Sequence, residues 1–422
     1  MPIVERFIGR EILDSRGTPT VEASCTLRGG ATGSASVPSG ASVGSAEAVE
    51  LRDCDLKRYN GLGCRKAAAN VSGPIHADAK GRQFEDQADF DRFLQSLDGT
   101  PDKSALGANA VLAASIAFAK ATAVDHGVSL WQRFAKIAEV QPVTLPRLTI
   151  NLFSGGKHAG GQVAIQDVLI VPAAARTIDE SLAVAHDVYR AAAHLTHSRY
   201  AMRLLRADEG GMAPPFRSEQ EMIETAIDAI HQAGYRPGKD VMLALDVAAT
   251  HFYSPAGYQL QNELLSSDQM TARIAQWVHD YPIVSVEDGL SEDDWSSWPK
   301  LRREIETRSL VVGDDLLCTN ASRVRRAINE QACNTLLLKV NQTGTLTEAA
   351  EAHKLACNAG WFVTISVRSG DTEDNWAADL AVGWAGDQFK NGSITQSERL
   401  AKYNRLLLIE EETKMPIVKW PN

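Results

Sequence analysis

The sequence predicts an α/β barrel, and two observations support this fold class. Five apolar, β-rich runs are too short for helices and follow one another roughly 25 to 40 residues apart, the length of one strand–helix unit. Continuous apolar strands are typical of a parallel sheet buried on both faces. Each run ends at a charged residue, and catalytic residues of such barrels collect at the carboxyl ends of the strands. The five runs are 241–246, 281–287, 309–314, 335–339 and 361–368.

The first part of the chain has a different pattern. Residues 1 to about 40 alternate apolar and polar positions between glycine-rich breaks, which predicts an antiparallel meander. The segment 37–44 combines proline, glycine and small residues, so it could move and bring backbone N–H groups near an anion. A plain solvated connection has the same composition. A helix is expected directly after it, around 47–53.

Three further segments are predicted to be helices. The segment 103–127 is strongly apolar and rich in alanine, with Ser104 and Gly127 as end signals. Longer helical patterns cover about 177–199 and 219–233. These helices would supply core and the outer layer of the barrel.

The chain is long enough for two domains, since it has 422 residues. The prolines at 142 and 146 bracket a short apolar stretch that we take as the boundary. We therefore expect an amino-terminal domain over residues 1–135 and a barrel domain over residues 146–422.

Composition excludes several classes of protein. The net charge of −10 argues against a nucleic-acid or anionic-membrane partner, because those partners require a basic face. No run approaches the ~20 apolar residues of a membrane span, and the charged first ten residues do not resemble a signal peptide. The six cysteines have no Cys-x-x-Cys spacing, which favours reduced, buried thiols. We expect a cytoplasmic protein.

Two loops and one strand carry further candidate residues. A glycine-rich segment, 154–161, holds His158; a lone histidine is usually structural, but at a strand end among glycines it could equally face an anion. Asp167 lies in a further apolar strand. Asp208 and Glu209 precede a glycine pair, where they could simply form a turn.

Three carboxylates predict a metal site. Asp246, Glu287 and Asp314 end successive predicted strands, so they should meet in space as hard oxygen ligands with no histidine or cysteine among them. That ligand type suits Mg²⁺. Any single one of these acids could instead cap a helix, but three caps at three successive strand ends would be an improbable coincidence.

Two bases come next in the order of strands. Lys339 and Arg368 close the following two runs. A lysine beside a metal ion loses its proton more easily, because nearby positive charge disfavours the ammonium form, so Lys339 is a candidate general base. The alternative is a side chain that extends from a strand end into solvent.

Longer motifs extend along nearly the whole chain. They are Asp14-Ser-Arg-Gly-Thr-Pro-Thr-Val-Glu22, Val37-Pro-Ser-Gly-Ala-Ser42, Leu97-Asp-Gly-Thr with Lys103-Ser-Ala-Leu-Gly-Ala-Asn-Ala110, Asp208-Glu-Gly-Gly211, Val286-Glu-Asp-Gly-Leu with Glu292-Asp-Asp-Trp295, Leu336-Leu-Leu-Lys-Val-Asn-Gln342, and Ser397-Glu-Arg-Leu-Ala-Lys-Tyr-Asn404. Together they are far more specific than a short motif. In them the chain resembles the enolase (phosphopyruvate hydratase) family.

The resemblance implies a fold, a cofactor and an assembly. The fold is an atypical TIM-type αβ barrel covered by a smaller amino-terminal α+β domain with a mobile loop at 37–44. The cofactor is Mg²⁺, two ions per subunit, and the substrate is a phosphorylated 2-hydroxy acid. The assembly is a homodimer in which Glu22 and Arg399 pair across subunits.

The resemblance also implies roles for individual residues. Asp246, Glu287 and Asp314 would hold the first ion, with Ser42 helping to hold the second. Lys339 would abstract the α-proton, and Glu209 would help the hydroxide leave as general acid. The substrate-binding set is Ser42, His158, Gln166, Arg368, Ser369 and Lys390, and Asp167 and His158 are counted with the catalytic residues.

The chain departs from the family pattern near the hydroxymethyl end of the substrate. Asp167 stands where the family carries glutamate, and Val367 stands where it carries histidine, so this part of the pocket loses a group that can donate, accept or carry charge. Further departures are Ser34, Ser154, the segment 202–207, His251, Asp371 and Gln396. They indicate a specialised paralogue.

Three functions are compatible with these residues. The first is a Mg²⁺-dependent lyase that dehydrates 2-phosphoglycerate, as in glycolysis. The second is a transferase similar to carboxyphosphonoenolpyruvate synthase, from phosphonate or phosphinate biosynthesis, which the altered end of the pocket favours. The third is a non-catalytic relative, which the retained acids and Lys339 disfavour.

Overall fold

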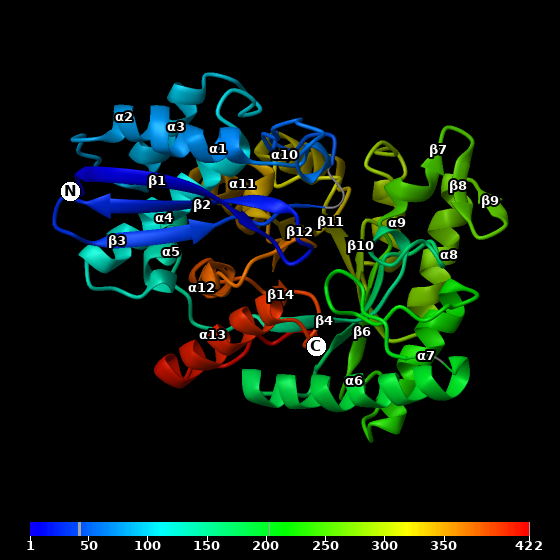
Figure 1. Cartoon of the computed structure of the whole chain (residues 1–422). Helices are drawn as coiled ribbons and strands as arrows, with labels where there is room; N and C mark the ends of the chain where they lie inside the picture. The colour runs from blue at the N-terminus through cyan, green and yellow to red at the C-terminus, as the bar shows by residue number, and fades with distance from the viewer. Residues whose placement is uncertain (41–43, 202, 422) are drawn as a thin grey trace.

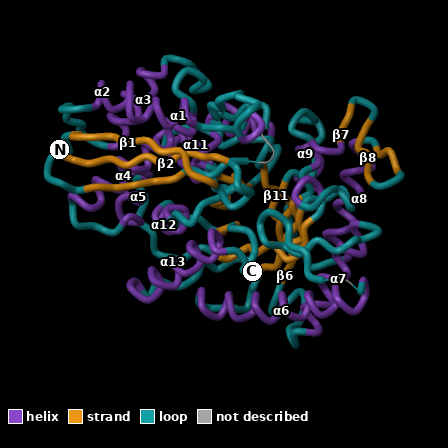
Figure 2. The backbone as a smooth tube through the Cα atoms, in the orientation of Figure 1, coloured by secondary structure: helices purple, strands orange, loops and turns teal. Residues whose placement is uncertain are grey.

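The structure is a computed structural model that describes residues 1–40, 44–201 and 203–421. Its two parts are an amino-terminal sheet with helices and a closed eight-stranded barrel (Figure 1). Figure 2 shows the sheet strands and the barrel strands as separate groups, with helices around both. The predicted fold class is thus confirmed, whereas the predicted boundary between domains stays a prediction.

The amino-terminal part is built on an antiparallel meander, as its alternating pattern predicted. Strands β1 (Val4–Leu13), β2 (Pro19–Leu27) and β3 (Thr32–Ser36) pair in chain order. Helix α4 (Ala108–Asp125) packs against β2 and β3 and is buried almost throughout. The other helical elements here are η1 (Tyr59–Gly61), α1 (Arg65–Asn70), η2 (Val71–Ile75), α2 (His76–Ala79), α3 (Gln87–Asp98) and α5 (Leu130–Ala138).

The barrel closes in the order β10-β11-β12-β13-β14-β4-β5-β6. All five apolar runs form strands within it, so their prediction is confirmed. The strands are β4 (Arg147–Ser154), β5 (Asp167–Val171), β6 (Met242–Asp246), β10 (Ile283–Glu287), β11 (Leu310–Gly313), β12 (Thr335–Leu338), β13 (Phe362–Ser366) and β14 (Gln388–Lys390).

Helices cover the outside of the barrel. The expected helices at 177–199 and 219–233 are confirmed as α6 (Ile178–Tyr200) and α7 (Glu219–Gln232), each with a hydroxyl N-cap. The remaining elements are η3 (Gly156–His158), η4 (Ala249–Phe252), a small sheet of β7 (Tyr253–Ser254), β8 (Gly257–Leu260) and β9 (Glu263–Leu265), α8 (Ser267–Asp280), α9 (Trp298–Ile305), α10 (Ala321–Glu330), η5 (Val340–Gln342), α11 (Leu346–Asn358), α12 (Trp376–Gly383) and α13 (Ser397–Thr413).

The strand pattern was wrong about direction at one position. The sequence predicted a parallel barrel, but β5 runs antiparallel to both of its neighbours, β4 and β6. An apolar run reads the same in either direction, so its composition could not reveal the reversal. The reversal places the first residue of β5 at the rim where the other strands end.

Two helix predictions in the amino-terminal part were wrong in detail. Residues 47–53 form no helix, because their backbone N–H groups bond to other segments; Ala48 donates to Gln342 and Val49 to Asp102. The helix expected from residue 103 begins only at Ala108, after the positive φ of Gly107. In both places contacts across the chain replace the local i to i−4 pattern.

Two expectations from composition have mixed outcomes. All six cysteines are free, but Cys54 and Cys357 are exposed, so the prediction of buried thiols is wrong for these two. No helix in the described part of the chain is by itself long and apolar enough to cross a membrane. Helices α4 and α5 pass that test of length and composition only as a pair bent by 115°.

Candidate active site

Every barrel strand brings a polar or charged side chain to one rim. Because β5 is reversed, its Asp167 lies beside the last residues of the neighbouring strands and pairs in register with Ser154 and Asp246. The rim set is Ser154, Asp167, Asp246, Glu287, Asp314, Lys339, Arg368 and Lys390, one from each strand or from the residues just after it.

The three predicted metal acids are buried and face lysines. Lys390 donates to Asp246 Oδ2 at 2.7 Å and to Glu287 Oε2 at 2.5 Å. Lys339 donates to Asp314 Oδ2 at 2.5 Å. Three carboxyl groups therefore share two ammonium groups in a buried site.

These contacts set the charge states. Burial lowers the pKa of Lys390, but its two carboxylate partners reverse this effect and hold the pKa well above its usual value. Burial and the neighbouring Asp246 raise the pKa of Glu287. Burial also lowers the pKa of Lys339, yet its acidic neighbours, Asp314 first and then Glu287, raise the pKa above its usual value. These contacts favour the ammonium form of Lys339. The easier deprotonation expected from the sequence depends on a neighbouring metal ion and stays a prediction.

The donor set fits Mg²⁺ in chemistry. Asp246, Glu287 and Asp314 offer only hard oxygen atoms, and a cationic group already lies between the first two. A metal ion bound by all three would require Lys390 to withdraw. Among the residues that the structure describes, two groups have potential ligand atoms within 4.8 Å of one another: His158 with Asp167 and Glu209, and Asp288 with Asp314 and Asp315. Asp246 and Glu287 belong to neither group.

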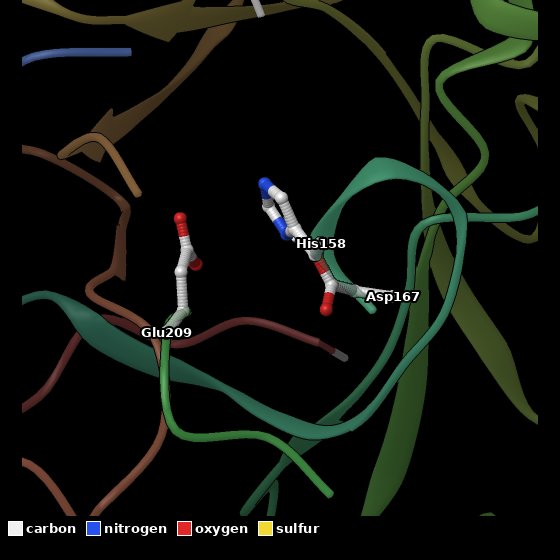
Figure 3. Close-up of side chains that lie close together, drawn as sticks. All are labelled: His158, Asp167 and Glu209. Atoms are coloured by element: carbon white, nitrogen blue, oxygen red, sulfur yellow. Dashed lines mark hydrogen bonds and ion pairs between the residues drawn. The ribbon is translucent and has the colours of Figure 1, made fainter. Parts of the chain in front are cut away.

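The first of these groups lies across the barrel from Lys339, since β5 and β12 are four places apart in the ring of eight strands. Nδ1 of His158 is 3.0 Å from Asp167 Oδ2, and Figure 3 shows the other ring nitrogen turned away from Asp167. Burial opposes the charge of His158, but Asp167 raises its pKa to about 9. Burial raises the pKa of Glu209, but the cationic groups around it, His158 first and then Arg399, Lys390 and Lys339, together hold this pKa below its usual value.

The predicted substrate-binding residues have intramolecular partners in this structure. Arg368 forms a buried ion pair with Glu47 at 2.7 Å, and Ser369 accepts a hydrogen bond from Arg16 at 3.1 Å. Gln166 donates to Asp246, while its Oε1 is buried and has no hydrogen-bond partner among the described residues. That unpaired acceptor is available for a ligand that can donate a hydrogen bond. Ser42 lies outside the described residues.

Several site residues were missed as candidates by sequence reasoning. Asp288 accepts backbone hydrogen bonds from Asp314 and Asp315, at 2.9 and 2.8 Å, and so fixes the turn that carries the third metal acid. Both Asp288 and Asp315 follow an acid at a strand end, and that doubled acid was the available signal. No sequence pattern indicated Glu47, which lies far from Arg368 in the chain.

The cavity at the rim is small in this structure. It measures about 20 Å³ and is lined by His158, Gln166, Glu209, Asp246, Ala248, His251, Asp288, Asp314, Asp315, Lys339, Ser366, Val367, Arg368, Ser369 and Lys390. Ligand pockets commonly measure about 300 to 1,000 Å³. A substrate therefore needs the buried ion pairs of Lys390, Lys339 and Arg368 to open. A larger hollow of about 570 Å³ lies elsewhere, against β1 to β3, and has no contact with these groups.

Comparison with known protein families gives two matches. Residues 4–134 match the enolase N-terminal domain, and residues 142–417 match the enolase C-terminal TIM barrel domain. The chain belongs to the enolase family. This membership supports an enolase-superfamily lyase, and enolases usually bind Mg²⁺, in keeping with the acidic groups at the rim.

Proposed function

We propose that this enolase-family chain removes the α-proton of a phosphorylated 2-hydroxy acid, 2-phosphoglycerate, and eliminates water to form phosphoenolpyruvate. The observation that carries the proposal is topological. Lys339, after β12, lies across the barrel from the cluster of His158, Asp167 and Glu209 beside β5. A base on one wall and an acid on the other suit an elimination in which proton and leaving group depart from different carbon atoms.

The residues divide the work as follows. Lys339 takes the α-proton after Asp314 has left its ion pair with Lys339, because the lysine can then lose its own proton. Glu209 accepts a hydrogen bond from Asn151, and its pKa lies below its usual value, so it must first gain a proton. It then supplies that proton to the departing hydroxide. Arg368 and His158 hold the phosphate by charge, and Lys390 faces the substrate carboxylate. Mg²⁺ held by the three rim acids would stabilise the negative charge that develops on that carboxylate.

The direct test is turnover. When the protein is incubated with 2-phosphoglycerate and Mg²⁺, phosphorus NMR should show phosphoenolpyruvate forming. A chelator should stop the reaction. Formation of no phosphoenolpyruvate at any Mg²⁺ concentration would contradict the proposal.

A second candidate function is favoured by Val367. This apolar side chain is buried at the cavity, among charged groups, and offers neither a proton nor a hydrogen bond. It supports a transferase similar to carboxyphosphonoenolpyruvate synthase, in which the altered pocket accepts a second phosphorus compound.

The two functions predict opposite effects of restoring the family residues. If the protein is a lyase, V367H combined with D167E should speed dehydration of 2-phosphoglycerate. If it is the transferase, the parent should form a new enolpyruvate product from an activated phosphonoformate, and the double variant should lose it. A pocket that gains or loses a polar partner can change discrimination by a factor of about 10⁴. Phosphorus NMR with and without the second compound distinguishes the two, and fast dehydration without a second product argues against the transferase.

We also infer a homodimer. In this structure Glu22 pairs with Arg10 at 2.8 Å, while Arg399 is fully buried and donates to the backbone of Arg368 and Ser369. The Arg399 Nε atom lies 3.3 Å from Glu398 Oε1 and the Nη1 atom 3.8 Å from Asp371 Oδ2, so both face carboxylates of the same chain. The dimer therefore rests on the family resemblance. Sedimentation at micromolar concentration should show a species of twice the 45.7 kDa chain mass. A single species at the chain mass would contradict the dimer.

A further inference from the structure

The Asp167 carboxylate is held at both of its oxygen atoms. The Ser154 hydroxyl donates to Oδ1 at 2.5 Å, and Nδ1 of His158 lies 3.0 Å from Oδ2. Ser154 and Asp167 are completely buried, and neither lines the rim cavity, whereas His158 does. Ser154 and Asp167 can therefore reach a substrate only through His158.

The backbone holds these three residues in place. Ser154 and Asp167 are direct partners in the antiparallel ladder between β4 and β5. The chain then folds back in η3, where Gly156 has a φ of +47° and donates to the Val163 carbonyl at 3.0 Å. A Cβ atom on Gly155 would come within 2.5 Å of the Ile165 carbonyl oxygen, so only glycine allows this close return. The fold thus places His158 directly over the first residue of β5.

We propose that Ser154 and Asp167 are positioning residues that fix His158 with its Nδ1 proton on Asp167 and its Nε2 directed at an oxygen atom of the substrate beside Glu209. The inference rests on the proposed function and deepens it. Ser154 fixes the carboxylate, the carboxylate fixes the ring, and the ring presents one charged N–H donor in one orientation.

The arrangement excludes two other roles. Ser154 is bonded to the acid and not to the histidine, so it is not activated as a nucleophile. Asp167 has a partner at each oxygen atom and does not line the rim cavity, so we assign it a positioning role in place of the catalytic one that the resemblance implies. The two departures from the family pattern, at 154 and 167, are thus partners of each other.

The charged groups around His158 agree with this role. Asp167 on β5, Glu209 before β6 and Asp246 at the end of β6 all favour the protonated ring. His251 also lies nearby, and burial, Lys157 and His158 lower its pKa. The histidine is therefore an imidazolium across the neutral pH range, because its pKa lies at about 9.

The test uses the metal-free full chain with ¹⁵N-labelled histidine, and H158Q identifies the His158 ring signals. In the parent protein His158 should titrate near pH 9 and, when neutral, carry its proton on Nδ1. D167N should lower the midpoint by at least about one pH unit, because an amide replaces the charge partner. S154A should leave the fold intact, since it removes only a hydroxyl, but should give ring signals for more than one orientation. S154N, which can donate an amide N–H to the same oxygen, should restore the single set.

Turnover gives a second readout. S154A should lower kcat about tenfold to a hundredfold with little change in KM, since a misplaced donor costs more in the transition state. In D167N the alkaline limb of the pH–rate profile should move to lower pH, because the active form is the protonated ring. Unchanged ring signals in both S154A and D167N would overturn the inference, even if turnover is fast. Altered ring signals in a chain that does not dehydrate 2-phosphoglycerate would support the positioning and reject the proposed reaction.

Discussion

Replacing Lys339 with alanine should stop the exchange of the α-proton of bound 2-phosphoglycerate with deuterated solvent. The ammonium of Lys339, just after β12, pairs with the rim acid Asp314. A positioned general base contributes about 10² to 10⁴ in rate, so exchange should fall by about that factor. Proton NMR in D₂O measures the exchange directly, whether or not water is then eliminated.

Two other variants make the Lys339 result specific. E209Q should still permit exchange while it blocks elimination, because Glu209 acts only on the leaving group. K354A removes an exposed lysine on α11 that pairs with Glu139, and it should behave as the parent protein does. Exchange that persists at the parent rate in K339A would exclude Lys339 as the base.

The candidate site was predictable where a strand ended in a charge. Asp246, Glu287 and Asp314 were found because apolar runs define strand ends, and the ends of parallel barrel strands converge whatever the sequence between them. The roles of single residues came from the resemblance to a family. They did not follow from the pattern.

The remaining features depend on contacts that no local pattern encodes. The direction of β5 depends on its pairing with β4 and β6 and not on its own residues. The sequence therefore placed Asp167 in a strand but could not show that it lies at the rim end of that strand. The Ser154–Asp167 pair needs that reversed direction before it can form. Glu47 was assigned to a helix, yet it lies in a bend after a turn. Its side chain pairs with Arg368, which lies far away in the chain.

The second large effect is expected at the metal site. D246A should weaken Mg²⁺ binding more than about 100-fold. Removing a residue that only hydrogen-bonds to a metal ligand already costs about 10 to 100-fold in affinity, and D246A removes a ligand itself. Asp246 is buried, and its Oδ2 accepts from both Lys390 and Gln166. Without it, two rim acids remain, and Mg²⁺ demands near-octahedral oxygen ligands that two carboxylates supply poorly.

A matched control for D246A lies near the other end of the same strand. Asp240 precedes β6 and forms an exposed ion pair with Arg236, so D240A removes the same kind of charge from outside the rim. Calorimetric titration with Mg²⁺ should give parent affinity for D240A and no measurable binding for D246A. D246A removes one of the two ion-pair partners of the buried Lys390 and leaves Glu287 as its remaining partner in the described structure. Thermal unfolding would therefore check that the variant still folds. If folded D246A binds Mg²⁺ as tightly as D240A, the first metal site is not the one formed by Asp246, Glu287 and Asp314.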